Sequence, residues 1–183
     1  MGELGYEIHV EAGEKAVDIY DALMASGRVA LAGFEAFNSM GLEKGHKLWH
    51  ADLHTTDLPV EAGLLFACKG LVNFEGKDHL ALQPKKRLVT FTVDPEVALN
   101  GNEPIYRNGE AVGYLRRGGF GYTINKGIGT GYVILKAKPT DQPVSEFVQQ
   151  GCYEVDVMGT RHKAEPSLWP LFDAKRAKMM LEE

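Results

Sequence analysis

Cysteine is scarce in this sequence. Only Cys68 and Cys152 occur among its 183 residues, far apart and outside any C-x-x-C arrangement. Two separated thiols cannot form the disulfide framework that holds a small secreted domain together. A chain of this length does not need one, because it is long enough to bury a hydrophobic core of its own. The cysteine usage therefore favours a reducing compartment.

Long apolar runs and excess positive charge are also missing. No stretch approaches the ~18 apolar residues of a membrane helix, and the amino end lacks the basic and apolar regions of a signal peptide. The net charge of -5 argues against a general nucleic-acid binder. We interpret the short basic clusters at 84–87 and 116–117 as solvated surface. We expect no nucleic-acid or membrane partner, and both the bacterial cytoplasm and the mitochondrial matrix suit the composition.

The first half of the chain shows a mixed pattern of helices and strands. Apolar residues recur with period two in some segments and with helical spacing in others. A strand that begins almost at residue 1 suggests a piece of a longer protein. The pattern predicts strands over 4–11 and 64–69, and helices over 14–26, 34–45 and 76–83.

After Pro84 the pattern becomes almost purely that of strands. Residues 87–93 alternate cleanly between apolar and polar side chains, and Asn108-Gly109 is a strong hairpin signal. A second hairpin is predicted near Gly159. This part therefore predicts a compact all-β barrel or sandwich. We place a domain boundary near residue 84, which gives one domain over 1–84 and another over 85–183.

Three histidines stand four residues apart at His46, His50 and His54. On a helix this spacing can bind zinc. The surrounding residues alternate as in an extended segment, where such side chains lie about 13 Å apart, too far for one ion. We favour a pocket wall or surface histidines and keep a zinc protein as an alternative. A nucleophilic triad finds no support, because G-x-S-x-G is absent.

Glu7 lies between Tyr6 and Ile8 in the first predicted strand. A carboxylate there can accept two parallel hydrogen bonds from an amidine-like edge, such as a pterin presents. An outward-facing strand glutamate is the alternative that the residues themselves leave open.

Four segments together resemble one known family. They are GELGYEIHV (2–10), NSMGLEKG (38–45), LWHADLHTTDLPVEAGL (48–64) and EPIYRNGEAVGYLRRGGFGYTINKGIGTGYV (103–133). Their order and composition resemble the aminomethyltransferases of the glycine-cleavage T-protein family. They are similar also to the folate-binding C-terminal halves of sarcosine and dimethylglycine dehydrogenases, which are flavoproteins that carry the same unit.

The resemblance implies a fold and a function. It implies an α+β class, with a partial ferredoxin-like folate-binding domain followed by a C-terminal all-β barrel. It also implies a tetrahydrofolate-dependent one-carbon transfer enzyme that captures the carbon of an amine as methylenetetrahydrofolate. FAD would bind only in a domain that this chain does not contain, so the partners are folate and the remaining domains of a longer polypeptide. A non-catalytic docking or regulatory module of the same fold is the alternative.

The resemblance also implies roles for individual residues. Glu7 matches the family glutamate that grips the pterin ring, and Trp49 and His50 fall in a segment near the folate cavity, as wall or domain-contact residues rather than metal ligands. Phe37 stands where T-proteins have an arginine that contacts folate. The family's catalytic aspartate lies upstream of the matched region. We therefore assign no catalytic residue and expect the chain alone to be inactive.

Overall fold

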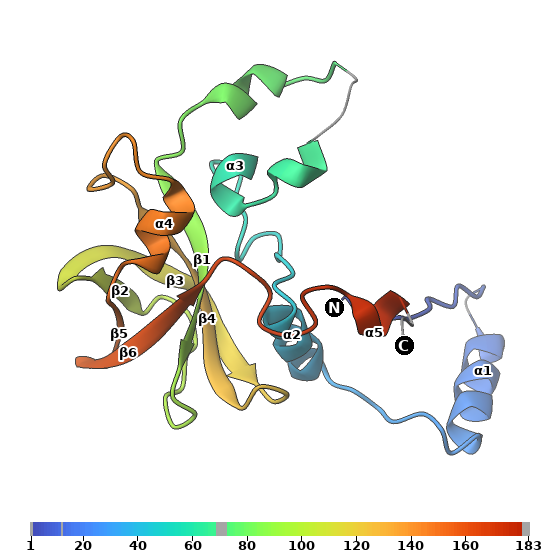
Figure 1. The fold of residues 1–183 in the computed structure, drawn as a ribbon. Coiled ribbons are helices and arrows are strands. Elements are labelled where there is room, and N and C mark those ends of the chain that lie inside the picture. The colour runs from blue at the N-terminus through green and yellow to red at the C-terminus, as the bar shows by residue number, and fades with distance from the viewer. Residues whose placement is uncertain (1, 12, 69–72, 181–183) are drawn as a thin grey trace.

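A closed barrel of six strands forms the centre of the computed structural model, which describes residues 2–11, 13–68 and 73–180 (Figure 1). Every neighbouring pair is antiparallel, in the order β1-β4-β3-β2-β5-β6, and β6 closes on β1. The predicted α+β class with a C-terminal all-β barrel is confirmed. The strands are β1 Lys86–Val93, β2 Pro104–Arg107, β3 Glu110–Gly121, β4 Lys126–Ile134, β5 Tyr153–Val157 and β6 Thr160–Ser167.

Both predicted hairpins are present, and their turns explain them. Asn108 and Gly109 join β2 to β3 with φ angles of 51° and 86°. Met158 and Gly159 join β5 to β6 with φ angles of 53° and 85°. Two successive positive φ angles give the turn that matches the twist of a two-residue hairpin.

The barrel interior is filled with apolar side chains. Phe91, Ile105, Leu115, Val133 and Val155 are each fully buried. Since such side chains stabilise a fold by roughly 1.5–3 kcal/mol each when fully buried, this interior is the main source of stability. The short helix α4 (Val144–Gln149) adds Phe147 and Val148 to the same cluster.

The second helix of the chain, α2 (Phe34–Glu43), packs against one end of the barrel. The Ser39 hydroxyl donates to the carbonyl of Phe120 at 2.5 Å. The Glu43 carboxylate, 2% exposed, accepts from the backbone N–H of Thr123 and Ile124 at 2.6 and 3.2 Å. These contacts fix α2 to the end of β3.

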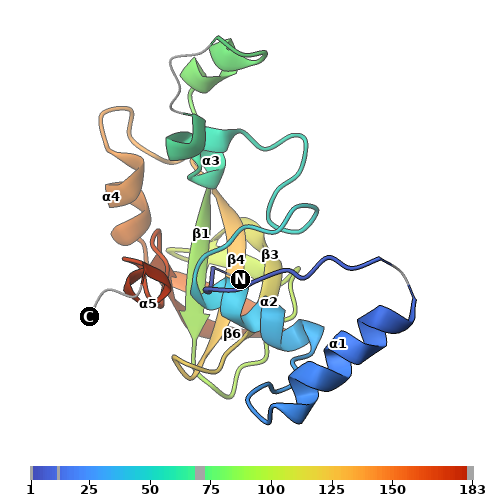
Figure 2. The same ribbon diagram turned by 90° about the vertical axis from the view of Figure 1, so that its right-hand side faces the viewer.

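The described residues from 5 to the start of α2 lie apart from the barrel (Figure 1 and Figure 2). Helix α1 (Glu14–Ala25) projects to one side (Figure 1). Its predicted range of 14–26 is confirmed to within one residue, and Gly27 follows it with a φ of 64°. The strand predicted over 4–11 is wrong: none of these residues belongs to a sheet.

Several short helices complete the structure. The predicted strand over 64–69 is wrong: residues Leu65–Cys68 form the 3-10 helix η1, and Lys69 lies outside the described residues. The predicted short helix over 76–83 is the 3-10 helix η2 (Lys77–Ala81). Among the described residues, no helix has the length and apolar character to cross a bilayer. The remaining helices are α3 (Pro59–Ala62) and α5 (Ala177–Met180).

Both ends of the described chain meet at the C-terminal end of α2. The Lys44 ammonium lies 2.9 Å from the Glu3 carboxylate and 3.1 Å from that of Asp173, and it donates to the carbonyl of Gly2 at 2.9 Å. Glu3 thus has a structural ion pair.

Candidate functional site

A tight turn over residues 48–53 replaces the extended stretch expected there. The carbonyl of Leu48 accepts from the backbone N–H of Asp52 at 2.9 Å, and the N–H of His50 donates to the carbonyl of Leu53 at 2.9 Å. His50 has a φ of 68°, a left-handed conformation that costs energy in a residue other than glycine. The surrounding contacts must therefore hold the turn in place.

Asp52 provides the first of these contacts. Its side chain is fully buried and accepts from the backbone N–H of Leu48 at 2.8 Å. It forms an ion pair with Arg117 at 2.8 Å and accepts a hydrogen bond from the hydroxyl of Thr130. Arg117 also donates to the carbonyl of His46 at 2.8 Å, so one guanidinium binds the turn at two points.

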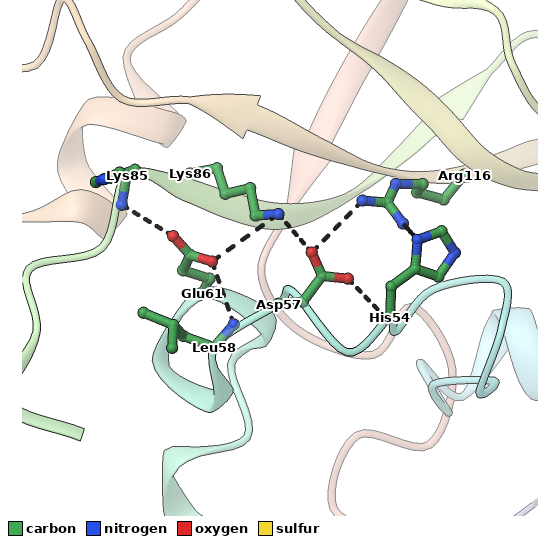
Figure 3. A network of polar contacts seen from close by, with 7 residues as sticks. All are labelled: His54, Asp57, Leu58, Glu61, Lys85, Lys86 and Arg116. Carbon is green, nitrogen blue, oxygen red and sulfur yellow. Dashed lines mark hydrogen bonds and ion pairs between the residues drawn. The ribbon is translucent and has the colours of Figure 1, made fainter. Parts of the chain in front are cut away.

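Asp57 provides a second anchor on the same side of the barrel (Figure 3). Its carboxylate, 1% exposed, pairs with Lys86 and lies 3.5 Å from Arg116. It also accepts from the backbone N–H of His54 at 2.8 Å. Burial by itself would raise the pKa of Asp57, but Lys86, the His54 N–H and Arg116 together lower it below its ordinary value.

Glu61 continues this network toward the start of β1. It accepts from the backbone N–H of Lys85 at 3.0 Å and of Leu58 at 3.2 Å (Figure 3). The segment from 48 to 61 is therefore bound to the barrel along its whole length by three buried carboxylates.

Three residues of the basic clusters expected on the solvated surface, Lys86, Arg116 and Arg117, are instead the partners of these carboxylates. Arg116 and Arg117 have side chains only 11% and 9% exposed, and Lys86 is 24% exposed. A β-bulge in β3 explains how adjacent arginines reach the same segment. Leu115 pairs with Gly131 and Arg117 with Thr130, which leaves Arg116 as the extra residue. Regular alternation would have sent one of them to the opposite face.

The turn displays two rings at its tip. Trp49 is 53% exposed, and its indole meets the imidazole of His50 edge to face at a centroid distance of 5.5 Å. The structure thus brings together two of the residues predicted to contact folate. Their role in binding stays a prediction.

Glu7, the third predicted contact, lies on the extended segment before α1. Its side chain is 90% exposed, and its carboxylate lies 3.6 Å from the ring of His9. Its role as a pterin ligand stays a prediction as well.

The histidine spacing does not produce a metal site in the described part of the chain. The ring of His54 uses both nitrogens: Nδ1 lies 2.7 Å from Arg116, and Nε2 lies 3.1 Å from the carbonyl of His50. The side chain of His46 lies instead against Gly2. Because the chain makes a tight turn between them, the three rings do not share one face.

A cavity of about 880 Å³ lies beside the anchored segment. It is bordered by residues within 44–47, 60–66, the first part of β1 and 167–176, together with Gly2, Leu53 and Ser145. Glu7, Trp49 and His50 are not among the residues that line it. This cavity could not be predicted from the sequence, because its walls come from several segments that lie far apart along the chain.

Comparison with known protein families gives a consistent match. The C-terminal barrel domain of the glycine cleavage T-protein matches residues 86–173, and the N-terminal domain of the same family matches residues 1–70.

Individual relatives agree with this match. The mitochondrial sarcosine dehydrogenase of Mus musculus is 42% identical over 97% of this chain, which spans 20% of that protein. The mitochondrial pyruvate dehydrogenase phosphatase regulatory subunit of Mus musculus is 31% identical over 97% of the chain, again about a fifth of its length, at 22%. The crystal structure of aminomethyltransferase T from Bartonella henselae superimposes with a TM-score of 0.73 at 21% identity, over 87% of this chain and 44% of that one. This chain therefore spans only a minor part of the relatives it matches.

Proposed function

Because this chain belongs to the glycine-cleavage T-protein family, we propose that it supplies one part of the folate site of an amine-demethylating enzyme. The enzyme would be of the sarcosine or dimethylglycine dehydrogenase kind. The family is one of folate-dependent one-carbon enzymes. The substrate amine and the role of FAD belong to this proposal.

The observation that carries the proposal is the anchored turn. An exposed indole paired with an imidazole is a suitable wall for a flat heterocycle. The turn would hold such a wall rigidly, because Asp52 and Asp57 fix it to the barrel through buried ion pairs. A binding group set on a rigid element loses little entropy when the ligand arrives.

The residues present fit a bound pterin in their chemistry. Among the described residues no backbone N–H donates to the Glu7 carboxylate, and the ring of His9 lies 3.6 Å from it, so both oxygens would be available for the two parallel N–H groups of a 2-aminopyrimidinone edge. Trp49 and His50 would contact the ring face or the adjoining domain. Tetrahydrofolate would accept the one-carbon unit and leave as methylenetetrahydrofolate. No residue of this chain is assigned a proton transfer, and FAD would be bound by another part of the enzyme.

A docking or regulatory module is the second candidate. Two observations favour it. The chain is 31% identical in sequence to a phosphatase regulatory subunit. Apolar side chains before the barrel are exposed, among them Tyr6 with 89% and Leu31 with 70% of its surface accessible. Such side chains mark a surface that another protein segment covers. In this case the chain would bind a protein and no folate.

A chimera separates the two candidates. The matching region of mouse sarcosine dehydrogenase is replaced by this chain, and a reduced folate such as 5-formyltetrahydrofolate is titrated calorimetrically. We expect binding to the chimera and little to the chain alone, because the other walls of the site would be missing. Tight binding to the chain alone would contradict the shared-site proposal.

Variants of the chimera test the assigned residue. Glu7→Gln should weaken folate binding about 10- to 100-fold, the value of a lost charge-assisted pair of hydrogen bonds. Glu11→Gln is the matched control, since Glu11 is exposed on the same segment. A chimera that retains FAD but binds no folate would favour the docking module. Equal effects of the two substitutions would remove Glu7 from the site.

A further inference from the structure

We propose that the cavity of about 880 Å³ beside the anchored segment is a binding site for an organic anion with an apolar body. Its volume lies within the range of small-molecule sites. Glu7, Trp49 and His50 do not line it, so the proposal does not depend on the proposed folate contacts. The lining residues that carry the argument are Lys47, Phe66, Arg87, Leu168, Trp169 and Arg176.

The cavity has an excess of positive charge. Four cationic side chains line it, those of Lys44, Lys47, Arg87 and Arg176, and Asp173 is the one acidic residue among the described lining residues. Asp173 is already engaged by Lys44, which also pairs with Glu3. Among the described residues, Lys47, Arg87 and Arg176 have no carboxylate within ion-pair distance.

Arg87 is the most telling of these cations. Arg87 is the second residue of β1, and its guanidinium packs against Gly63. A Cβ added at Gly63 would lie 2.7 Å from Nη2 of Arg87. One nitrogen, Nη1, donates to the carbonyl of Val60 at 2.8 Å, whereas the buried Nε has no acceptor among the residues that the structure describes. The side chain is therefore held in place while part of its hydrogen-bonding capacity remains unused.

Lys47 is a second cation in the lining of the cavity. Its ammonium donates to the carbonyl of Gly45 at 2.9 Å. Burial lowers the pKa of Lys47 and of Arg87, which is the physical sign that each cation is incompletely compensated by its surroundings. A buried charge without a partner costs free energy, and a bound anion would offset that cost.

A guanidinium and an ammonium recognise an anionic head group such as a carboxylate, sulfonate or phosphate. The rest of the cavity is largely apolar. Leu64, Leu65, Phe66 and Leu168 line it, and Trp169 stands at its rim with 73% of its surface exposed. A bare inorganic ion would leave these apolar side chains exposed to water. The lining therefore suits a ligand whose charged head binds Arg87 and whose body fills the apolar part.

Two fluorescent probes with nearly the same aromatic body test the proposal. 8-Anilino-1-naphthalenesulfonate carries an anionic group, and N-phenyl-1-naphthylamine is neutral. The exposed apolar surface elsewhere on the chain would bind both, so the measured quantity is the ratio of their affinities. We expect the wild-type chain to favour the sulfonate at least about 10-fold, a difference of about 1.4 kcal/mol. A ratio near one would overturn the proposal.

Substitutions locate the binding. Arg87→Gln should bring the ratio of the two affinities close to one. Lys47→Gln should lower this ratio in part, and it leaves the packing of Arg87 against Gly63 intact. Arg161→Gln is the control, because Arg161 is on β6 and paired with Glu154. An unchanged ratio in both Arg87→Gln and Lys47→Gln would contradict the site. Displacement of the probe by octyl phosphate or by p-aminobenzoylglutamate then distinguishes a phosphate head from a carboxylate, and the second result would link the cavity to folate.

Discussion

Asp57 shows how much one buried carboxylate can organise. It lies where a backbone segment, a lysine and an arginine converge, and its side chain is 1% exposed. The Tyr132 ring lies under the same two cations, 4.6 Å from the Lys86 ammonium and 5.0 Å from the Arg116 guanidinium. Neutralising this carboxylate removes the shorter ion pair of Lys86, which keeps only Glu61 at 4.0 Å, and leaves Arg116 without its carboxylate.

Asp57→Asn should therefore lower the free energy of unfolding at pH 7 by about 3–5 kcal/mol, the cost of leaving buried cations unpaired. The pKa of Asp57 is lowered in the folded state, so its contribution is present above the unfolded value of about 4 and lost as the pH falls through the folded value. The free energies of unfolding of wild type and Asp57→Asn, measured in urea, should differ less near pH 3 than at pH 7.

The control for this prediction is an exposed pair. Lys163 and Glu165 lie 2.7 Å apart with side chains 83% and 59% exposed. Glu165→Gln should change stability by less than about 1 kcal/mol at pH 7, as solvent-exposed ion pairs do. A gap for Asp57→Asn that stays constant from pH 7 to pH 3 would show that shape rather than charge matters at this position.

At the scale of elements, the barrel depends on close approach between β3 and β4. A side chain at Gly113 would place its Cβ 2.0 Å from the carbonyl oxygen of Tyr132, a backbone atom that cannot move alone. Gly41, within α2, offers open space: nothing outside its own helix would meet an added Cβ. The two glycines therefore serve different purposes.

Replacing each glycine by alanine should change the stability of the chain in opposite directions. Gly113→Ala should destabilise the barrel by about 3 kcal/mol through forced backbone movement. Gly41→Ala should stabilise the chain by roughly 0.5–1 kcal/mol, because alanine has the higher helix propensity. Thermal unfolding followed by circular dichroism measures both. Equal tolerance at the two positions would mean that β3 and β4 can separate at little cost.

Elements with local causes could be predicted from the sequence. The hairpins at Asn108-Gly109 and Met158-Gly159 follow from turn chemistry, and α1 and α2 follow from helical spacing. The β-bulge at Arg116 could not be predicted, since nothing local distinguishes it. If the bulge is not known, regular alternation predicts that one of the two arginines faces solvent. For the same reason, the sequence does not predict the turn that they anchor.

At the scale of the whole molecule, the part before α2 contrasts with the barrel. The described side chains of α1 are exposed or half-buried, and Val17 and Tyr20 remain 58% and 49% exposed. The alternation over residues 4–11 predicted a strand, yet no described segment pairs with it. A strand needs a neighbour for its backbone hydrogen bonds, so the pattern alone could not decide the outcome.

This contrast predicts unequal protection from hydrogen exchange. Helix α1 has 12 residues, a length at which a helix without tertiary packing is marginal in water. Its amides should exchange within seconds, whereas those of α2, a helix of 10 residues, should be protected through its contacts with Phe120 and Thr123. Amides of β1 and β4 should exchange most slowly, at rates set by global unfolding.

Hydrogen exchange measured by mass spectrometry on the chain and on the sarcosine dehydrogenase chimera gives the decisive comparison. In the chimera, a covering domain should bury Val17 and Tyr20 and raise the protection of α1 to that of α2, while β1 and β4 stay unchanged. Since the two helices are similar in length, a difference between them in the chain alone reflects packing rather than propensity. Equal protection of α1 and α2 in the chain alone would show that α1 already has its partner within this sequence.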